Sequence, residues 1–530
     1  MTAPTPGTAA PRSSSRSSAL IAAGIFLSRL LGLLRQSLIA KYLGAGLVSD
    51  AFNGAFKLTN FLQNLFGEGA LSASFIPVYA SALQRGDHKE ADRIAGAVAA
   101  LLAMVTSLIV VLGIVFAPYV VELVVGGFTG AKMELAVRLT RILFPGAGIF
   151  VMSAWCLGIL NSHRRFFLSY AAPVFWNIAM IAALLFYGPR RGEVDLAVLL
   201  AWASVLGAAL QMAVQLPSVF KLVRQPRFVA DIGFPPVREV VRNFLPAFVS
   251  RGVVQLSAFI DTRLASHIAA DGVVTLLQNA QTIYMLPISL FGISVSAAEL
   301  PEMSRDGGIG AAGLERVRAR LNAALPRVAY FVVPSAIGFF VLGEAIAGVL
   351  LEHGKFTRAD TLRTWAILAG SAIGLLASAL GRLYSSTFYA LRDTRTPLRY
   401  AVARILLAGV LGYLFAFPLP RMLGLPAWTG AVGLSLSSAL SGWVEFLLLR
   451  RALSARIGHT GIPLPGLARL WGAGLAAGAA GWGVMQLIDP ARQMVRGTTA
   501  LVAFALVYGA VTRALGVPEA RGIMGRVRRR

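Results

Sequence analysis

Two arginines interrupt the first long apolar segment of the chain. Arg29 and Arg35 lie within residues 19–40, where most other positions are Leu, Ile, Ala or Gly. One Arg at the centre of a membrane-spanning helix costs about 2.5–3.5 kcal/mol on insertion scales. Membrane proteins keep such groups where they face water or an anion inside the bundle, and a guanidinium binds phosphate bidentately. We therefore predict that Arg29 and Arg35 face an internal cavity and attract an anion.

The geometry of one helix limits how these two arginines act together. Residues six positions apart point about 120° apart around an ideal helix. Gly32, which lies between them, would permit a bend that narrows this angle. The alternative is that one or both side chains snorkel to an interface, although Arg29 lies deep in the segment for that.

A second group of ionisable residues lies near the middle of the chain, in Arg251, Asp261 and Arg263. Arg251 is predicted at a depth close to that of Arg29, where it would complete a cationic site. Asp261 and Arg263 are two apart, so they point to opposite faces of a regular helix. An intramembrane carboxylate such as Asp261 is the candidate for coupling transport to Na⁺ or H⁺.

The segment after the first apolar helix is the least hydrophobic, and we predict that it lines a polar cavity. Asp50 and Lys57 are seven apart and share one helical face. We expect them to form a local ion pair, or Asp50 to hold Lys57 or Arg35 in place. The polar residues of this segment are Asn53, Lys57, Asn60, Gln63 and Asn64.

Enzyme and metal signatures are missing, so we predict a transporter with no catalytic residues, no metal and no bound cofactor. Cys156 is the only cysteine, and the five His show no zinc-ligand spacing. Residues 354–357 read Gly-Lys-Phe-Thr. A phosphate loop needs a Gly further upstream and a Ser or Thr directly after the Lys, but here that Gly is missing and Phe follows the Lys. The net charge of +25 reflects Lys and Arg in loops on one side of a membrane and predicts no nucleic-acid partner.

The composition predicts an all-α polytopic membrane protein. Of 530 residues 56% are hydrophobic and 14% charged, with mean hydropathy +0.70, against about 25% charged in soluble domains. We predict about fourteen spans, by apolar stretches of roughly 20 residues. They begin near Ala19, Asp50, Ile94, Leu135, Phe167, Asp195, Asn243, Val273, Asn322, Trp365, Leu398, Trp428, Leu467 and Arg496.

Charge in the loops predicts the orientation. An even number of spans puts both termini on one side, and the basic clusters make that side cytoplasmic. Residues 1–18 are rich in Pro, Ser and Thr and are predicted to form a disordered tail, and residues 517–530 a basic cytoplasmic tail. Arg382, Arg404 and Glu445 fall near the inner interface, where snorkelling accounts for them.

A faint repeat predicts two six-helix lobes, residues 19–220 and 221–455. Leu-Phe-Gly at 65–67 precedes Pro77, and Leu-Phe-Gly at 290–292 precedes Pro301. Such repeats build transporters around a central site, although chance similarity is the competing explanation. Spans thirteen and fourteen, in residues 456–516, fall outside the repeat. There Gly474 and Gly478 predict close helix packing, and a lipid-facing groove is the alternative.

Several motifs resemble the MurJ/MviN lipid II flippase family along almost the whole chain. The N-terminal matches are Ser-Arg-Leu-Leu-Gly-Leu-Leu-Arg at 28–35, Leu-Gly-Ala-Gly at 43–46, Ser-Asp-Ala-Phe at 49–52, Ala-Phe-Lys-Leu at 55–58 and Gly-Glu-Gly-Ala at 67–70 with Phe-Ile-Pro at 75–77. Later matches are residues 160–162 with 165–166, 172–173 with Asn177, 353–357, 388–397 and 433–436.

The resemblance implies two lobes in a V around a central cationic cavity, and two extra helices that form a groove for a lipid tail. It implies lipid II as the substrate, in the bacterial inner membrane, with Arg29, Arg35 and Asp50 at positions that look essential in the family. Glu68, in the Gly-Glu-Gly-Ala motif at 67–70, is expected to support the cavity. We further expect a monomer surrounded by membrane lipids, driven by the membrane potential or by a coupling ion.

Two positions depart from the family. Relatives carry Arg where this chain has Gln63 and, in some, where it has Thr282; Gln and Thr supply hydrogen bonds but no charge. Arg251 or Arg263 is our hypothesis for the missing charge. A sodium site at Asp261 would lack a partner in the eleventh span. The alternatives are another polysaccharide-lipid or drug/cation exporter of the same superfamily, or a lipid-binding relative that does not transport.

Overall fold

The computed structural model describes residues 13–66, 68–306, 310–489 and 493–520. Within them it is helical, with no strand. The first part of the chain forms α1 (Ser13–Leu43), α2 (Leu47–Phe66), α3 (Glu68–Gln84), α4 (His88–Val115), α5 (Ala117–Val125), α6 (Gly130–Ser162), α7 (Phe166–Tyr187) and α8 (Glu193–Leu222).

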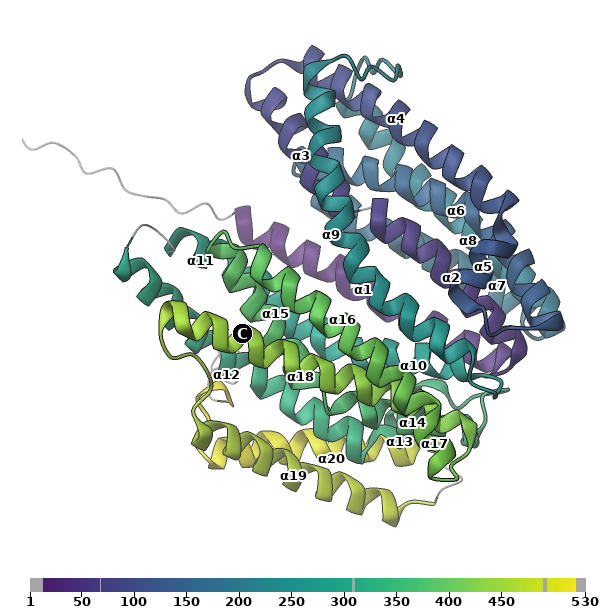
Figure 1. Cartoon of the computed structure of the whole chain (residues 1–530), viewed down its shortest axis with the longest axis vertical. Helices are drawn as coiled ribbons and strands as arrows, with labels where there is room; N and C mark the ends of the chain where they lie inside the picture. Colours follow the sequence, from purple (N-terminus) through teal and green to yellow (C-terminus); the bar gives the residue numbers. More distant parts are fainter. Residues whose placement is uncertain (1–12, 67, 307–309, 490–492, 521–530) are drawn as a thin grey trace, which may run out of the picture. The chain divides into compact units, whose positions relative to one another are not determined.

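The second part forms α9 (Pro235–Ser266), α10 (Val273–Pro287), a π-helix η1 (Ile288–Ile293), α11 (Ser294–Asp306), α12 (Ala311–Val341), α13 (Gly343–Leu351), α14 (Arg358–Ala372), α15 (Leu375–Ala390), α16 (Arg395–Ala416), α17 (Pro418–Met422), a 3₁₀ turn η2 (Ala427–Thr429), α18 (Gly430–Ile457), α19 (Leu464–Leu487) and α20 (Gln493–Ala514). Figure 1 labels these elements.

The prediction of a polytopic helical protein is confirmed. All fourteen predicted starting points fall inside helical elements. Within the described residues nine helices are long and apolar enough to cross a membrane, or ten if α14 and α15, bent by 46°, count as one span. The count of fourteen stays a prediction. Of the predicted tails, residues 1–12 and 521–530 lie outside the described residues, and α1 already begins at Ser13.

The repeat that is faint in the sequence is plain in the order of the helices. The nine-residue α5 follows the long α4, and the nine-residue α13 follows the long α12. Pro77 lies inside α3, directly after α2, and Pro301 lies inside α11, after α10 and η1. The series α1–α2–α3–α4–α5 therefore recurs as α9–α10–α11–α12–α13, which is the pattern of a transporter built from repeats.

Internal contacts divide the chain into two compact units. The first unit contains the residues up to 39 together with 55–121 and 135–252. The second contains 40–54, 122–134 and the residues from 253 onwards. The short segments 40–54 and 122–134 thus belong with the second half of the chain, although they come from the first copy of the repeat. The predicted lobe boundaries stay a prediction.

The first unit is built around an apolar core between α3, α4 and α6. Its largest fully buried side chains include Phe75, Tyr79, Ile94 and Ile159. A Cβ atom on Gly158 of α6 would lie 3.1 Å from the ring of Phe75, so α6 packs closely against α3. The indole nitrogen of Trp155 donates to the carbonyl of Ala95 at 3.1 Å and satisfies a polar group in this core.

In the second unit, α19 packs against α12 and α20 (Figure 1). A Cβ atom on Gly474 would lie 2.3 Å from Ile337, and one on Gly478 would lie 3.2 Å from it. Close packing at these two glycines, predicted from their spacing, is thereby confirmed. Glu344 on α13 also accepts a hydrogen bond from Nη1 of Arg496 at 3.2 Å, which fixes α20 to the unit.

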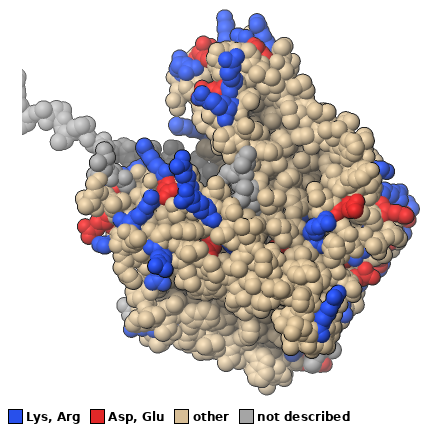
Figure 2. All heavy atoms as spheres, in the orientation of Figure 1, with Lys and Arg blue, Asp and Glu red and all other residues tan. Residues whose placement is uncertain are grey.

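The surface fits a protein surrounded by lipid along its middle. On the face drawn in Figure 2, Lys and Arg gather in separate groups, and broad areas without charged side chains lie between them. On α16, for example, the exposed residues along one face are Val402, Leu406 and Val410. A helix face of this composition is stable against hydrocarbon but not against water.

Candidate functional site

The guanidinium of Arg35 is held by α7 in the first unit. Its Nη1 donates a hydrogen bond to Oδ1 of Asn177 at 3.0 Å, and its Cζ lies 4.3 Å from the ring centroid of Trp176. Asn177 is oriented for this contact, because its Nδ2 donates to the carbonyl of Pro173 at 3.1 Å. Arg35 is therefore positioned by a neutral acceptor and an aromatic face, and it has no acidic partner among the described residues.

Arg35 keeps hydrogen-bond donors to spare. Its Nε is buried and has no hydrogen-bond partner among the described residues. A guanidinium carries five N–H donors, and a buried donor left unpaired costs about 1–3 kcal/mol. An anion whose oxygen accepts a hydrogen bond from Nε would remove this cost.

Arg29 lies on the same uninterrupted helix, and its side chain is exposed. Between the two arginines, a Cβ atom on Gly32 would lie 4.0 Å from Oδ1 of Asn177, so α7 passes close to α1 at this point. That both arginines face one cavity stays a prediction.

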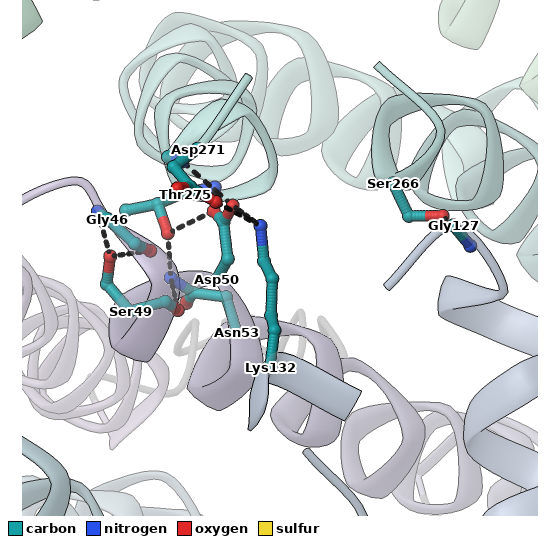
Figure 3. Close-up of polar contacts among 10 residues, drawn as sticks. Gly46, Ser49, Asp50, Asn53, Gly127, Lys132, Ser266, Asp271 and Thr275 are labelled. Atoms are coloured by element: carbon teal, nitrogen blue, oxygen red, sulfur yellow. Dashed lines mark hydrogen bonds and ion pairs between the residues drawn. The ribbon is translucent and has the colours of Figure 1, made fainter. Parts of the chain in front are cut away.

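A carboxylate in the second unit joins the beginnings of three helices (Figure 3). Asp50, in the first turn of α2, is fully buried. Its Oδ2 accepts from Nζ of Lys132 at 2.7 Å and from the amide of Gly272 at 2.9 Å. Its Oδ1 accepts from the amide and the hydroxyl of Thr275, both at 2.9 Å. Asp50 thus caps the N-terminus of α10 from another helix, where the free amides and the helix dipole favour negative charge.

The rest of this cluster is also saturated with hydrogen bonds. Nδ2 of Asn53 donates to the hydroxyl of Thr275 at 3.1 Å and to the carbonyl of Ser49 at 2.9 Å. The hydroxyl of Ser49 accepts from the amide of Gly46 at 2.8 Å, at the end of the α1–α2 loop. Lys132 also lies 3.2 Å from Oδ1 of Asp271. We call the group of Asp50, Lys132, Gly272 and Thr275 the Asp50 latch.

The predicted partners of Asp50 are wrong. The carboxylate binds Lys132 and the start of α10, and neither Lys57 nor Arg35 contacts it. The prediction failed because spacing along one helix reveals only local neighbours, whereas Lys132 is 82 positions away in the sequence. No signal in the sequence pointed to Lys132 or Thr275.

The polar face of α2 continues into the first unit and is not packed into its core. Lys57, Asn60 and Gln63 are partly exposed and Asn64 is exposed. The opposite side of the helix is buried through Leu58, Thr59, Leu65 and Phe66. These four polar residues are accessible, as a cavity lining requires. The side chains of Glu68 and Arg251 lie outside the part of the chain that the structure describes.

Asp261 and Arg263 point to different surroundings, as their spacing predicts. Asp261 lines a small cavity in the second unit. The polar groups around it come from α10, α14 and α18, as Gln281, Tyr284, Ser371, Ser435 and Ser438.

Arg263 instead binds the carboxyl end of α5. Its Nη1 donates to the carbonyls of Glu122 and Leu123, each at 2.7 Å. A cation at the C-terminus of a helix satisfies free carbonyls and the dipole, so this contact is structural. The hydroxyl of Thr282 donates to the carbonyl of Gln278 in its own helix at 2.9 Å and adds no charge either.

A repeat-built helical membrane protein with arginines inside its apolar helices belongs to the class of membrane transporters. Within the described residues no cluster of His, Cys, Asp and Glu is suited to hold a metal ion. The family model "Lipid II flippase MurJ" matches residues 39–488. The chain therefore belongs to the MurJ family.

Curated relatives agree with this assignment. The chain is 33% identical over 454 residues to a probable lipid II flippase MurJ of Rhizobium meliloti (strain 1021), covering 84% of this chain and 81% of the relative. It is 32% identical over 436 residues to the lipid II flippase MurJ of Burkholderia cenocepacia, covering 81% and 82%.

Solved structures show the same fold. A structure titled lipid II flippase MurJ, inward closed conformation, matches with a TM-score of 0.77 at 24% identity and covers 94% of this chain and 99% of its own. An inward-facing multidrug transporter of the MATE family matches with a TM-score of 0.64 at 18% identity, covering 83% and 98%.

Proposed function

We propose that this chain moves lipid II, the undecaprenyl-diphosphate-linked peptidoglycan precursor, across the bacterial inner membrane. The direction is from the inner to the outer leaflet, by alternating access, with both termini cytoplasmic. Membership of the MurJ family supports the substrate. The observation that carries the proposal is Arg35, a guanidinium in an apolar helix that is positioned by neutral groups and keeps an Nε donor without a partner among the described residues.

Arg35 suits the diphosphate for a chemical reason. Charge-assisted hydrogen bonds to phosphate are roughly twice as strong as neutral ones. Asn177 and Trp176 orient the guanidinium before the substrate arrives, so little side-chain entropy is lost on binding. We assign Arg29 and Arg251 to the same anion, with Lys57, Asn60, Gln63, Asn64 and Glu68 as polar residues around the head group.

The two ends of the substrate need different surroundings. Each buried CH₂ of a lipid chain contributes about 0.8 kcal/mol, so drawing the polyprenyl tail through water would cost tens of kcal/mol. Only the sugar-peptide diphosphate is therefore expected to enter the protein. The mainly apolar surface of α20 supports a place for the tail, at Ala505, Leu506, Gly509, Ala510, Arg513 and Ala514.

The Asp50 latch is proposed as the contact that closes one end of the path. Asp50 at the start of α2 holds Thr275 at the start of α10, and these two helices occupy equivalent places in the two copies of the repeat. Alternating access requires the ends of such helices to separate and rejoin. Four hydrogen bonds to one buried carboxylate would stabilise the closed form, and they would break again when this end of the path opens.

The membrane potential is the proposed driving force. Moving a diphosphate of about −2 out of a negative interior gains roughly 4.6 kcal/mol per 100 mV. We propose no bound cofactor, and the cavity at Asp261 is the place we assign to any coupling cation.

The test is translocation of labelled lipid II in vesicles that contain the purified chain, read by reaction with a membrane-impermeant reagent. The wild type is expected to expose lipid II on the far side, and Arg35→Gln to slow this at least tenfold. Arg190→Gln, an exposed arginine between α7 and α8, is the control and should translocate at the wild-type rate. A wild-type chain that moves no lipid II, although folded, would overturn the proposal.

A further inference from the structure

Helix α15 carries a polar face in the middle of an otherwise apolar unit. Every residue of α15 that is not buried is Ser, Gly, Arg or Tyr; these residues are Ser378, Gly381, Arg382, Ser385, Ser386 and Tyr389. They recur every three or four positions and therefore form one stripe along the helix. The neighbouring α16 instead exposes Val402, Leu406 and Val410, as a lipid-facing helix does. The contrast indicates that the α15 stripe faces water.

Arg382 is the charged residue of this stripe. It lies eight positions before Ala390, the last residue of α15, which is about 12 Å along the helix. It is exposed and has no hydrogen bond or ion pair within the described part of the chain. A Cβ atom on the adjacent Gly381 would meet no atom within 4 Å, so the helix is not closely packed at this point of the stripe.

The surroundings of Arg382 carry an excess of positive charge. Nε of Arg404 on α16 lies 3.0 Å from Oε2 of Glu445 on α18, without the alignment of a hydrogen bond. Arg404 and Glu445 therefore form an ion pair, and their place near the inner interface stays a prediction. Arg382 interacts electrostatically with both of them and with Tyr284. The two guanidinium groups and the one carboxylate together carry a net charge of +1.

A charge in this position needs a reason, because ionisable groups inside membrane helices are costly unless they serve a site. The stripe is also fixed in place, since the hydroxyl of Tyr284 on α10 donates to the hydroxyl of Ser378 at 2.9 Å. Arg263, which was a candidate for the charge missing at Gln63 and Thr282, is engaged with the carbonyls of α5. Arg382 has no such engagement.

We propose that Arg382, supported by Arg404, binds an oxyanion of the head group of the transported lipid. The oxyanion is either a carboxylate of the peptide or a phosphate of the diphosphate, since a guanidinium fork accepts both. The inference rests on the proposed function and adds to it a second cationic subsite, carried by the second unit. Arg382 thereby becomes a residue that determines which head groups are bound.

The test compares two ligands and three variants of the full chain in detergent. The ligands are lipid II and the same undecaprenyl diphosphate disaccharide without the peptide. The variants are Arg382→Gln, Arg382→Lys and, as the matched control, Arg399→Gln, which removes an exposed charge from α16. Equal thermal midpoints for all three show that folding is intact, as expected for side chains without partners.

Arg382→Gln is expected to raise the dissociation constant for lipid II about tenfold or more. Arg382→Lys should recover part of this loss, and Arg399→Gln should stay within twofold of the wild type. Unchanged binding of the peptide-free lipid identifies the carboxylate as the ligand, and equal weakening for both lipids identifies the diphosphate.

The inference is overturned if Arg382→Gln binds both lipids as Arg399→Gln does. Arg35→Gln, measured in parallel, separates this result from a failure of the proposed function. If Arg35→Gln weakens binding and Arg382→Gln does not, the subsite at Arg382 alone is refuted. If the wild type binds neither lipid, the proposed function falls as well.

Discussion

Replacing Asp50 by Asn should strongly destabilise the second unit. The Asn oxygen can still accept from Thr275, but its amide would place N–H donors against Nζ of Lys132 and the amide of Gly272. Two hydrogen bonds to a charged acceptor are lost, at about 1.5–3 kcal/mol each. Breaking a buried ion pair by removing one partner costs about 3–5 kcal/mol, which agrees with this range.

Lys132 reduces the cost, because it is 12% exposed and can turn to Asp271. We therefore take about 3 kcal/mol as the expected loss. At about 2 °C per kcal/mol, the lower part of the range for large domains, the thermal midpoint falls by about 6 °C. The assay is thermal unfolding of the purified chain in detergent, followed by tryptophan fluorescence.

Asp271→Asn is the matched control, because it removes the other carboxylate beside Lys132. Its side chain is 68% exposed, so the pair with Lys132 is worth about 0–1 kcal/mol and the midpoint should fall by at most about 2 °C. The reasoning is refuted if Asp50→Asn and Asp271→Asn shift the midpoint equally.

Three further outcomes are expected. Translocation in vesicles should rise with an imposed membrane potential, because moving a diphosphate of about −2 out of a negative interior gains roughly 4.6 kcal/mol per 100 mV; a translocation rate that does not respond to voltage would contradict this. Gly272→Ala should lower the thermal midpoint, because Gly272 has φ +83° and a Cβ atom there would lie 2.5 Å from the carbonyl oxygen of Ala45; an unchanged midpoint would argue against the tight approach. In residues 225–234, the protection of the amides against hydrogen exchange, relative to the intrinsic rate at each pH, should fall as the pH drops below about 4. The hydrogen bond from Arg93 lowers the pKa of Asp231, so the stabilisation by this carboxylate is present above its unfolded pKa and is lost as the pH falls through the folded one. Arg93→Gln should weaken that pH dependence, because the backbone amides of Gly233 and Phe234 still lower the pKa of Asp231.

Much of the fold could be predicted from the sequence, because a membrane protein shows its helices as apolar stretches of near-constant length. The start of each predicted span falls inside a helix. In the sequence, the repeat around Pro77 and Pro301 consists of only a few matching residues. In the structure, the order of the helices around these two prolines is the same in both copies. What the sequence did not reveal are breaks within spans, such as the one between α14 and α15.

The site could be predicted only in part, because chemistry at one position depends on partners far along the chain. Arg35 could be recognised from the sequence because an arginine inside a membrane-spanning helix is costly. Its contacts with Asn177 and Trp176 could not be predicted, because they depend on the packing of α7 on α1. Arg263 was expected near the substrate and binds the end of α5 instead. The spacing of Asp261 and Arg263 predicted that their side chains point to opposite faces of the helix. It did not indicate which group Arg263 would contact.

Binding of undecaprenyl diphosphate, compared with uncharged undecaprenol, tests the central claim most directly. The claim is that the guanidinium of Arg35 binds pyrophosphate inside the membrane. We predict that the wild-type chain binds the diphosphate at least a hundredfold more tightly than the alcohol, and that Arg35→Gln loses at least tenfold of this preference. Equal affinity of the wild type for both lipids, or a preference that Arg35→Gln leaves intact, would contradict the claim.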